Sequence, residues 1–170
     1  MEDWKKYLEV QSVKFTMHSY SLAHLCKGTS IKNVGTNEEI KYPDLGSIFL
    51  LRRAQIENYL MFYYLNIQPQ TKDEGELRYY LYELSGFSHR QQYDAINPES
   101  IKKKEAEKKE IELLKERIKN NSAFQNLPLQ KQNHLLENVP SKLIGWEKLI
   151  ESSHLKTELF LIQGHYQQYN

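Results

Sequence analysis

The sequence predicts an all-α protein, an antiparallel helical bundle of about five or six helices with one long charged helix. Apolar residues recur at helical spacing through most of the chain. Sustained period-two alternation and Asn-Gly or Asp-Gly hairpin turns, the usual strand signals, are almost absent. A chain of 170 residues can bury a core without metals or disulfides, so we expect a single helical domain over residues 1–170.

The first helix is predicted from Trp4 to about Cys26. Its apolar positions are Tyr7, Leu8, Val13, Phe15, Tyr20, Leu22 and Leu25. The following stretch, GTSIKNVGTNEEIKYPD, predicts a long loop that begins at Gly28 and closes at Pro43 and Asp44. Asp44 is expected to cap the next helix because its short carboxylate can accept a backbone N–H of the first turn.

The second helix is predicted over residues 45–66 and the third over Asp73 to Ala95. One side of the second carries Leu50, Ala54, Glu57, Met61, Tyr64 and Leu65. The inner side of the third carries Leu77, Tyr80, Leu81, Leu84, Phe87 and Ser88. The turn around Pro69 is short, so these two helices are expected to form an antiparallel hairpin.

The long charged helix is predicted over Ile101 to Asn121, with a thin apolar stripe of Ile111, Leu114 and Ile118. We interpret it as a solvated helix that projects from the body or lies along its edge, and the sharper alternative is a partner-binding coiled coil.

The C-terminal third predicts two more helices. One is short and starts near Pro128, and the last begins at Trp146 or His154 and reaches the terminus. Since no ending signal follows the last helix, we expect the chain to be a C-terminally trimmed part of a longer protein.

Composition excludes several classes of protein. The 23 basic and 22 acidic residues give a formal charge of +1, which provides no global electrostatic footprint for nucleic acid. Cys26 is the single cysteine, so an intramolecular disulfide and a cysteine metal framework are excluded. No signal peptide opens the chain, and the charges within residues 45–66 argue against a membrane span. A cytoplasmic location is therefore expected.

Charged and polar residues on the second and third helices form the candidate binding site. Arg53 and Glu57 are four residues apart and can meet on one helix surface. A charged pair beside a bundle core is costly unless it is well hydrogen-bonded. The candidate binding residues are Arg52, Arg53, Glu57, Tyr82, Ser85 and His89. In the functional interpretation, His89 and Arg90 join Arg53 and Glu57 in a polar pocket between the two helices. In the structural interpretation, Ser85 allows close helix contact and His89 forms a hydrogen bond at the end of the core.

The twelve tyrosines also have two interpretations. Those on the second and third helices could stack nucleic-acid bases, but without a neighbouring basic stripe core packing is favoured. We expect a homodimer or another protein partner to use the tyrosine-rich hairpin, whereas RNA or nucleotide binding is unsupported by charge.

Metal and cofactor signals are weak. Glu151 and His154 form one Glu-x-x-His pair and Glu57 could be a further helical ligand, but the second such pair of a dinuclear site is missing. We therefore predict no metal site and no cofactor, and a carboxylate-bridged metal protein is the third hypothesis for function.

The run LLRRAQIENYLMFYYL, the tyrosine-rich helix after it, the long charged helix and the terminal GHYQQYN resemble uncharacterised bacterial helical proteins similar to the HEPN superfamily. The resemblance spans Asp44 to Asn170 and implies a binding or regulatory module, in a bacterial defence or toxin-related system. Many HEPN members are metal-independent ribonucleases with an Arg-x4–6-His motif. None of the five arginines here has a histidine at that distance, so no catalytic residue is assigned. The alternative is a ribonuclease or nucleotide-directed toxin whose site gathers Arg52, Arg53, Glu57 and His89.

Overall fold

The computed structural model describes residues 6–33, 35–36, 38–153 and 155. The described chain is predominantly helical, with one two-stranded sheet, which confirms the all-α prediction. It divides into two compact units between Tyr64 and Leu65. Each unit is described below by itself.

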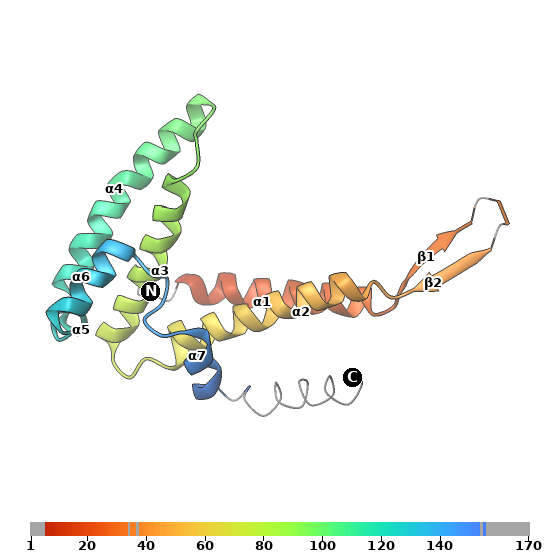
Figure 1. The fold of residues 1–170 in the computed structure, drawn as a ribbon, viewed down its shortest axis with the longest axis horizontal. Helices are drawn as coiled ribbons and strands as arrows, with labels where there is room; N and C mark the ends of the chain where they lie inside the picture. The colour runs from red at the N-terminus through yellow and green to blue at the C-terminus, as the bar shows by residue number, and fades with distance from the viewer. Residues whose placement is uncertain (1–5, 34, 37, 154, 156–170) are drawn as a thin grey trace. The chain divides into compact units, whose positions relative to one another are not determined.

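The first unit is built on two antiparallel helices, α1 (Lys6–Leu25) and α2 (Leu45–Phe62), which lie side by side (Figure 1). Hydrogen bonds join them: Asn58 Nδ2 donates to the Gln11 backbone carbonyl at 3.0 Å, and Gln55 Nε2 donates to Ser19 Oγ at 2.5 Å. Asn58 is buried, so its bond to Gln11 offsets the cost of removing the side-chain amide from water.

Serine and threonine are tolerated inside α1 because their hydroxyl groups bond to the helix itself. Ser12, Thr16 and Ser19 each donate to the carbonyl four residues earlier, at 2.7–2.9 Å. Glycine follows the helix at Gly28, which has φ +81°, a left-handed conformation that side chains rarely adopt.

The predicted loop from Gly28 to Asp44 is wrong, because the chain forms a β-hairpin there. Strands β1 (Thr29–Lys32) and β2 (Glu39–Tyr42) pair antiparallel, with Ile31 opposite Ile40. Asp44 caps α2 as predicted, since its carboxylate accepts from the Ser47 N–H at 3.1 Å and from the Ser47 hydroxyl at 2.6 Å. These hydrogen bonds from Ser47 hold the pKa of Asp44 below its ordinary value.

A π-helical turn, Tyr63–Ile67, follows α2, so the predicted continuous helix to residue 66 ends earlier than expected. The predicted apolar side of α2 is also partly wrong: Leu50 is 72% exposed, whereas Asn58 and Leu60 are buried.

The second unit contains α3 (Lys72–Gln91), α4 (Pro98–Asn120), α5 (Ser122–Gln125), α6 (Leu129–Asn138) and α7 (Trp146–Ser152). Helices α3 and α4 lie side by side and antiparallel (Figure 1). The core cluster between these elements is apolar and consists of Leu77, Leu81, Leu84, Leu114, Ile118, Phe124 and Leu135.

Sequence periodicity predicted the inner faces of α3 and α4. Leu77, Leu81 and Leu84 are at most 1% exposed, and Leu114 and Ile118 of the thin stripe join them. The predicted solvated helix therefore packs along α3 through that stripe, while its other faces meet water.

Polar side chains fix the ends of these helices. Thr71 and Asn97 cap α3 and α4, and Asn121 caps α5 through its contact with the Phe124 N–H. Asn121 Nδ2 also donates to the Asp73 carbonyl at 2.9 Å, which ties the start of α5 to the start of α3.

Each of these helices has its antiparallel partner within its own unit: α1 for α2, and α4 for α3. The predicted α2–α3 hairpin would join the two units, so it stays a prediction. The last predicted helix is observed over α7, and its predicted continuation toward Asn170 lies outside the described residues. Within the described ranges, no helix is both long and apolar enough to cross a bilayer.

Candidate binding surface

The six residues predicted to form a binding site fall into two sets. Arg52, Arg53 and Glu57 lie on α2 of the first unit, whereas Tyr82, Ser85 and His89 lie on α3 of the second. Their gathering into one pocket therefore stays a prediction.

Arg53 and Glu57 meet as their spacing predicts, with Arg53 Nε 2.9 Å from Glu57 Oε1. Their side chains are 79% and 47% exposed, so the expected place beside a bundle core is wrong for this pair. Arg52 is also exposed. Ion pairs in water contribute little to stability, and this one costs little to form.

The α3 residues have different environments. Ser85 is buried at 6% exposure, as its structural interpretation predicts, whereas Tyr82 is half-buried and His89 is exposed. Arg90 binds α4, since its Nε lies 2.9 Å from Glu107 Oε1. Its guanidinium also lies 4.7 Å from the centre of the ring of Phe87 on its own helix. Arg90 thus joins α3 to α4.

The tyrosines of the predicted hairpin are largely packed. Tyr64 and Tyr79 are at most 4% exposed, and Tyr59, Tyr63 and Tyr80 are half-buried. These rings supply buried area, which agrees with the core interpretation and leaves little of them for stacking on bases.

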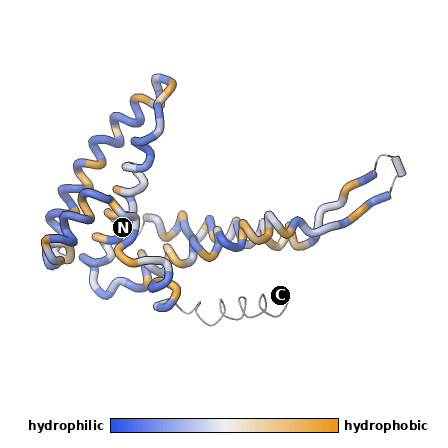
Figure 2. The backbone as a smooth tube through the Cα atoms, viewed as in Figure 1, coloured by the Kyte–Doolittle hydropathy of each residue, from blue (hydrophilic) through white to orange (hydrophobic). Residues whose placement is uncertain are grey.

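Exposed apolar side chains gather instead on the first unit. On this unit they come from both helices and both strands: Leu8, Val10, Val13, Phe15, Met17, Tyr20, Ile31, Ile40, Tyr42, Leu45, Phe49 and Leu50. Figure 2 shows hydrophobic segments along α1 and α2 and within both strands. Single exposed apolar residues are ordinary on proteins, but several that share one face of an element indicate an interaction surface.

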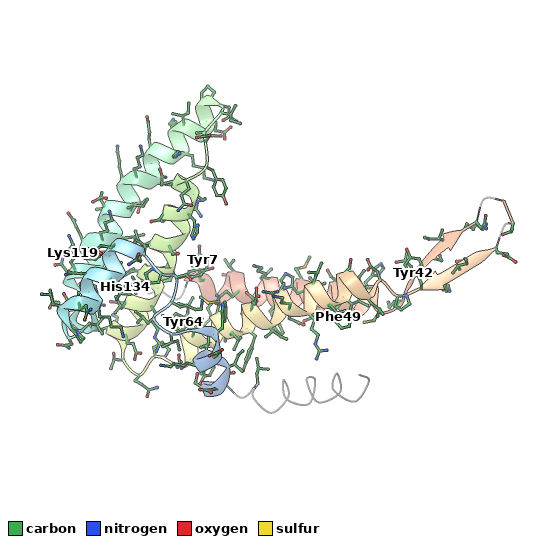
Figure 3. The ribbon with its side chains drawn as sticks, in the orientation of Figure 1. Tyr7, Tyr42, Phe49, Tyr64, Lys119 and His134 are labelled. Atoms are coloured by element: carbon green, nitrogen blue, oxygen red, sulfur yellow. The ribbon has the colours of Figure 1, made fainter. Side chains whose placement is uncertain are left out.

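The β-hairpin has one apolar and one polar face. Because side chains alternate along a strand and cross-strand partners share a face, Ile31, Ile40 and Tyr42 lie on one side. They are 53%, 60% and 42% exposed. The other side carries Ser30, Lys32, Glu39 and Lys41. We call the first side the hairpin face. Tyr42 lies where the hairpin joins α2, which carries Phe49 further on (Figure 3).

A shallow groove of about 240 Å³ lies between α1 and α2. Phe15, Tyr59 and Phe62 supply apolar walls, and the buried amide of Asn58 lies among them. Pockets for drug-sized ligands typically measure about 300–1,000 Å³, so this groove is better suited to a single side chain of a protein partner.

Among the described residues, no group of three or more His, Cys, Asp or Glu side chains is placed to hold a metal ion. Of the predicted Glu151–His154 pair, His154 lies outside the described part of the chain.

Comparison with known proteins found no match to the chain among family models, curated proteins or solved structures. The resemblance to the HEPN superfamily therefore stays a hypothesis drawn from the motifs.

Sequence reasoning missed the hairpin face. Thr29 and Ile31 are two residues apart, and polar residues lie between and after them. Ile40 and Tyr42 are also two residues apart in the second strand, and this period of two was a signal for the hairpin face. Each strand has only four residues, however, and none of the usual turn dipeptides joins them.

Proposed function

We propose that this protein is a HEPN-like binding or regulatory module of a bacterial defence or toxin-related system. It acts in the cytoplasm and captures a protein partner through its first unit. The motifs in residues 44–170 support the class, and the apolar hairpin face carries the proposal of partner binding.

The physical argument concerns the cost of leaving the hairpin face in water. A two-stranded hairpin is marginally stable by itself, and its stability improves when one face is covered. Burying apolar surface releases about 25 cal/mol per Å², so covering Ile31, Ile40 and Tyr42 favours association. Because Ser30, Lys32, Glu39 and Lys41 lie on the opposite side, the hairpin can bind on one side and stay solvated on the other.

The test is a pull-down from lysate of the source organism with the full chain as bait. Ile31→Lys places a charge on the hairpin face and is expected to lose the bound partner. Ser30→Lys is the matched control, because it adds the same charge to the neighbouring position on the polar side. Equal recovery of the partner by both variants would contradict the proposal.

A second arm of the test addresses catalysis. The purified chain is incubated with RNA in the presence of a chelator, and under the proposal the RNA stays intact. If the unaltered chain cleaves RNA and both Arg53→Ala and His89→Ala lose this cleavage, the result would contradict the binding module and support the ribonuclease alternative.

A further inference from the structure

Helix α1 carries a second apolar stripe on the surface of the first unit. Val10, Val13, Met17 and Tyr20 follow one another at intervals of three, four and three residues. This is the spacing of the a and d positions that form the seam between paired helices. Their exposed fractions are 58%, 57%, 59% and 74%. We call these four residues the α1 stripe.

The α1 stripe is distinct from the side of α1 that contacts α2. The Gln11 carbonyl and the Ser19 hydroxyl accept hydrogen bonds from α2, and Gln11 is buried. At ~100° per residue, the centre of the stripe lies roughly 180° around the helix from the midline between Gln11 and Ser19. The stripe therefore has the spacing of residues that pack against another helix, but α2 packs against a different side of α1.

We infer that the α1 stripe binds the α1 stripe of a second copy of this chain, with the two helices antiparallel about a two-fold axis. The axis passes near position 15, so that Val10 of one copy meets Tyr20 of the other and Val13 meets Met17. This inference does not rest on the proposed function, because the hairpin face is a different surface.

Side-chain size favours this orientation. Antiparallel pairing places a small valine against a large residue in every layer, which fills the seam evenly. Parallel pairing would place Tyr20 against Tyr20 and Val10 against Val10, which leaves one crowded layer and one loose layer. A two-fold contact also closes on itself, so the association stops at the dimer.

The exposed area is sufficient for a modest dimer. With roughly 150–200 Å² for a side chain of this size, the four residues expose on the order of 400 Å² in each copy. A two-fold contact buries this surface twice. The total of about 800 Å² is the size of a weak, concentration-dependent dimer, smaller than the roughly 1,200–2,000 Å² of stable interfaces.

The test uses cysteine cross-linking in the full chain after Cys26→Ser. Val13→Cys and Met17→Cys are prepared separately, mixed, and oxidised gently. The inference predicts that the mixture forms the 13–17 cross-linked dimer several-fold faster than either variant alone forms a dimer. Faster cross-linking of each variant with itself would show parallel pairing and overturn the inference.

Val13→Lys tests the surface itself. Val13 is 57% exposed, so this change is expected to leave helicity and thermal unfolding unaltered while it removes the dimer. Ala23→Lys is the matched control, because Ala23 is an exposed α1 residue off the stripe. If no mixture cross-links and light scattering gives the monomer mass, the stripe is covered in another way and the inference fails. The hairpin-face pull-down then still decides the proposed function.

Discussion

Two ion pairs with the same spacing show how environment decides what a residue contributes. Arg53–Glu57 on α2 has side chains 79% and 47% exposed, whereas in Arg78–Glu74 on α3 the corresponding values are 8% and 29%. Arg78 Nη2 lies 2.5 Å from Glu74 Oε1, and its Nη1 donates to Gln68 Oε1 at 2.8 Å. The second pair belongs to the packed part of its unit.

Alanine substitutions should separate the two pairs. Arg53→Ala is expected to change the free energy of unfolding by less than about 1 kcal/mol, because water screens the pair. Arg78→Ala should cost on the order of 3 kcal/mol, since it leaves the Glu74 carboxylate partly buried without its cation. Chemical denaturation of both variants measures the difference. A large loss for Arg53→Ala would show that its pair is buried.

The Glu74 carboxylate also makes a pH prediction. Burial by itself raises its pKa, but the Gln70 N–H and Arg78 outweigh this and hold the pKa below the ordinary value of 4.5. Because the folded-state pKa is depressed, the stabilisation is present above that value and is lost as the pH falls through the folded-state pKa.

Unfolding of the unaltered chain and Glu74→Gln should therefore differ at neutral pH, with the variant less stable. The two curves should converge in acid, once the pH has fallen below the folded-state pKa of Glu74. A constant difference from neutral to acid pH would assign the effect of the substitution to packing.

Residue spacing thus predicted which side chains contact each other better than it predicted which side chains are buried. The four-residue interval predicted the contact of Arg53 with Glu57, and the place of Asp44 just before the second helix predicted its N-cap role. Spacing carries no information on which side of α2 receives another helix, so the exposure of Arg52 and Arg53 could not be predicted. The same limit applies to the six-residue pocket, which needs a contact between α2 and α3 that the spacing within either helix does not predict.

Among the elements, α4 shows how a thin apolar stripe is enough to dock a charged helix. Leu114 and Ile118 are at most 2% exposed within the core of the second unit, while Leu113 on the same helix is 46% exposed. Glu107 is buried as well, and it pairs with Arg90 across the α3–α4 contact.

Ile118→Ala is expected to lower the free energy of unfolding by about 2–5 kcal/mol, because it removes buried methyl groups and leaves a cavity. Leu113→Ala, the control on the neighbouring surface of α4, should cost under about 1 kcal/mol. Thermal and denaturant unfolding can compare them. Similar losses for both would contradict the docking of α4 through its stripe.

Helical elements were predictable from sequence because a period of 3.6 residues persists over several turns, as in α3 and α4. The β-hairpin was not, since each strand is four residues long and its apolar face is exposed. That hairpin brings the end of α1 back to the start of α2, so a connection that looked like a long loop joins antiparallel neighbours.

At the scale of the whole molecule, the two units differ in how they bury apolar residues. The second has a core cluster contributed by α3, α4, α5 and α6. The first exposes apolar side chains on α1, on the hairpin face and on α2. Because α1 has apolar residues on two sides, periodicity could predict the helix but not which side would meet α2.

Both proposals about function concern surfaces of the first unit. The proposed module binds a protein through the hairpin face, and the inferred dimer forms through the α1 stripe. Both depend on the same claim, that the exposed apolar residues of the first unit are buried in association.

Sedimentation equilibrium of the full chain over a wide concentration range tests that claim most directly for the α1 stripe. The unaltered chain should pass from the monomer mass to twice that mass and no further, Ala23→Lys should follow it, and Val13→Lys should stay at the monomer mass. An unaltered chain that remains monomeric at the highest concentration, or a Val13→Lys variant that dimerises as well as the control, would contradict the account.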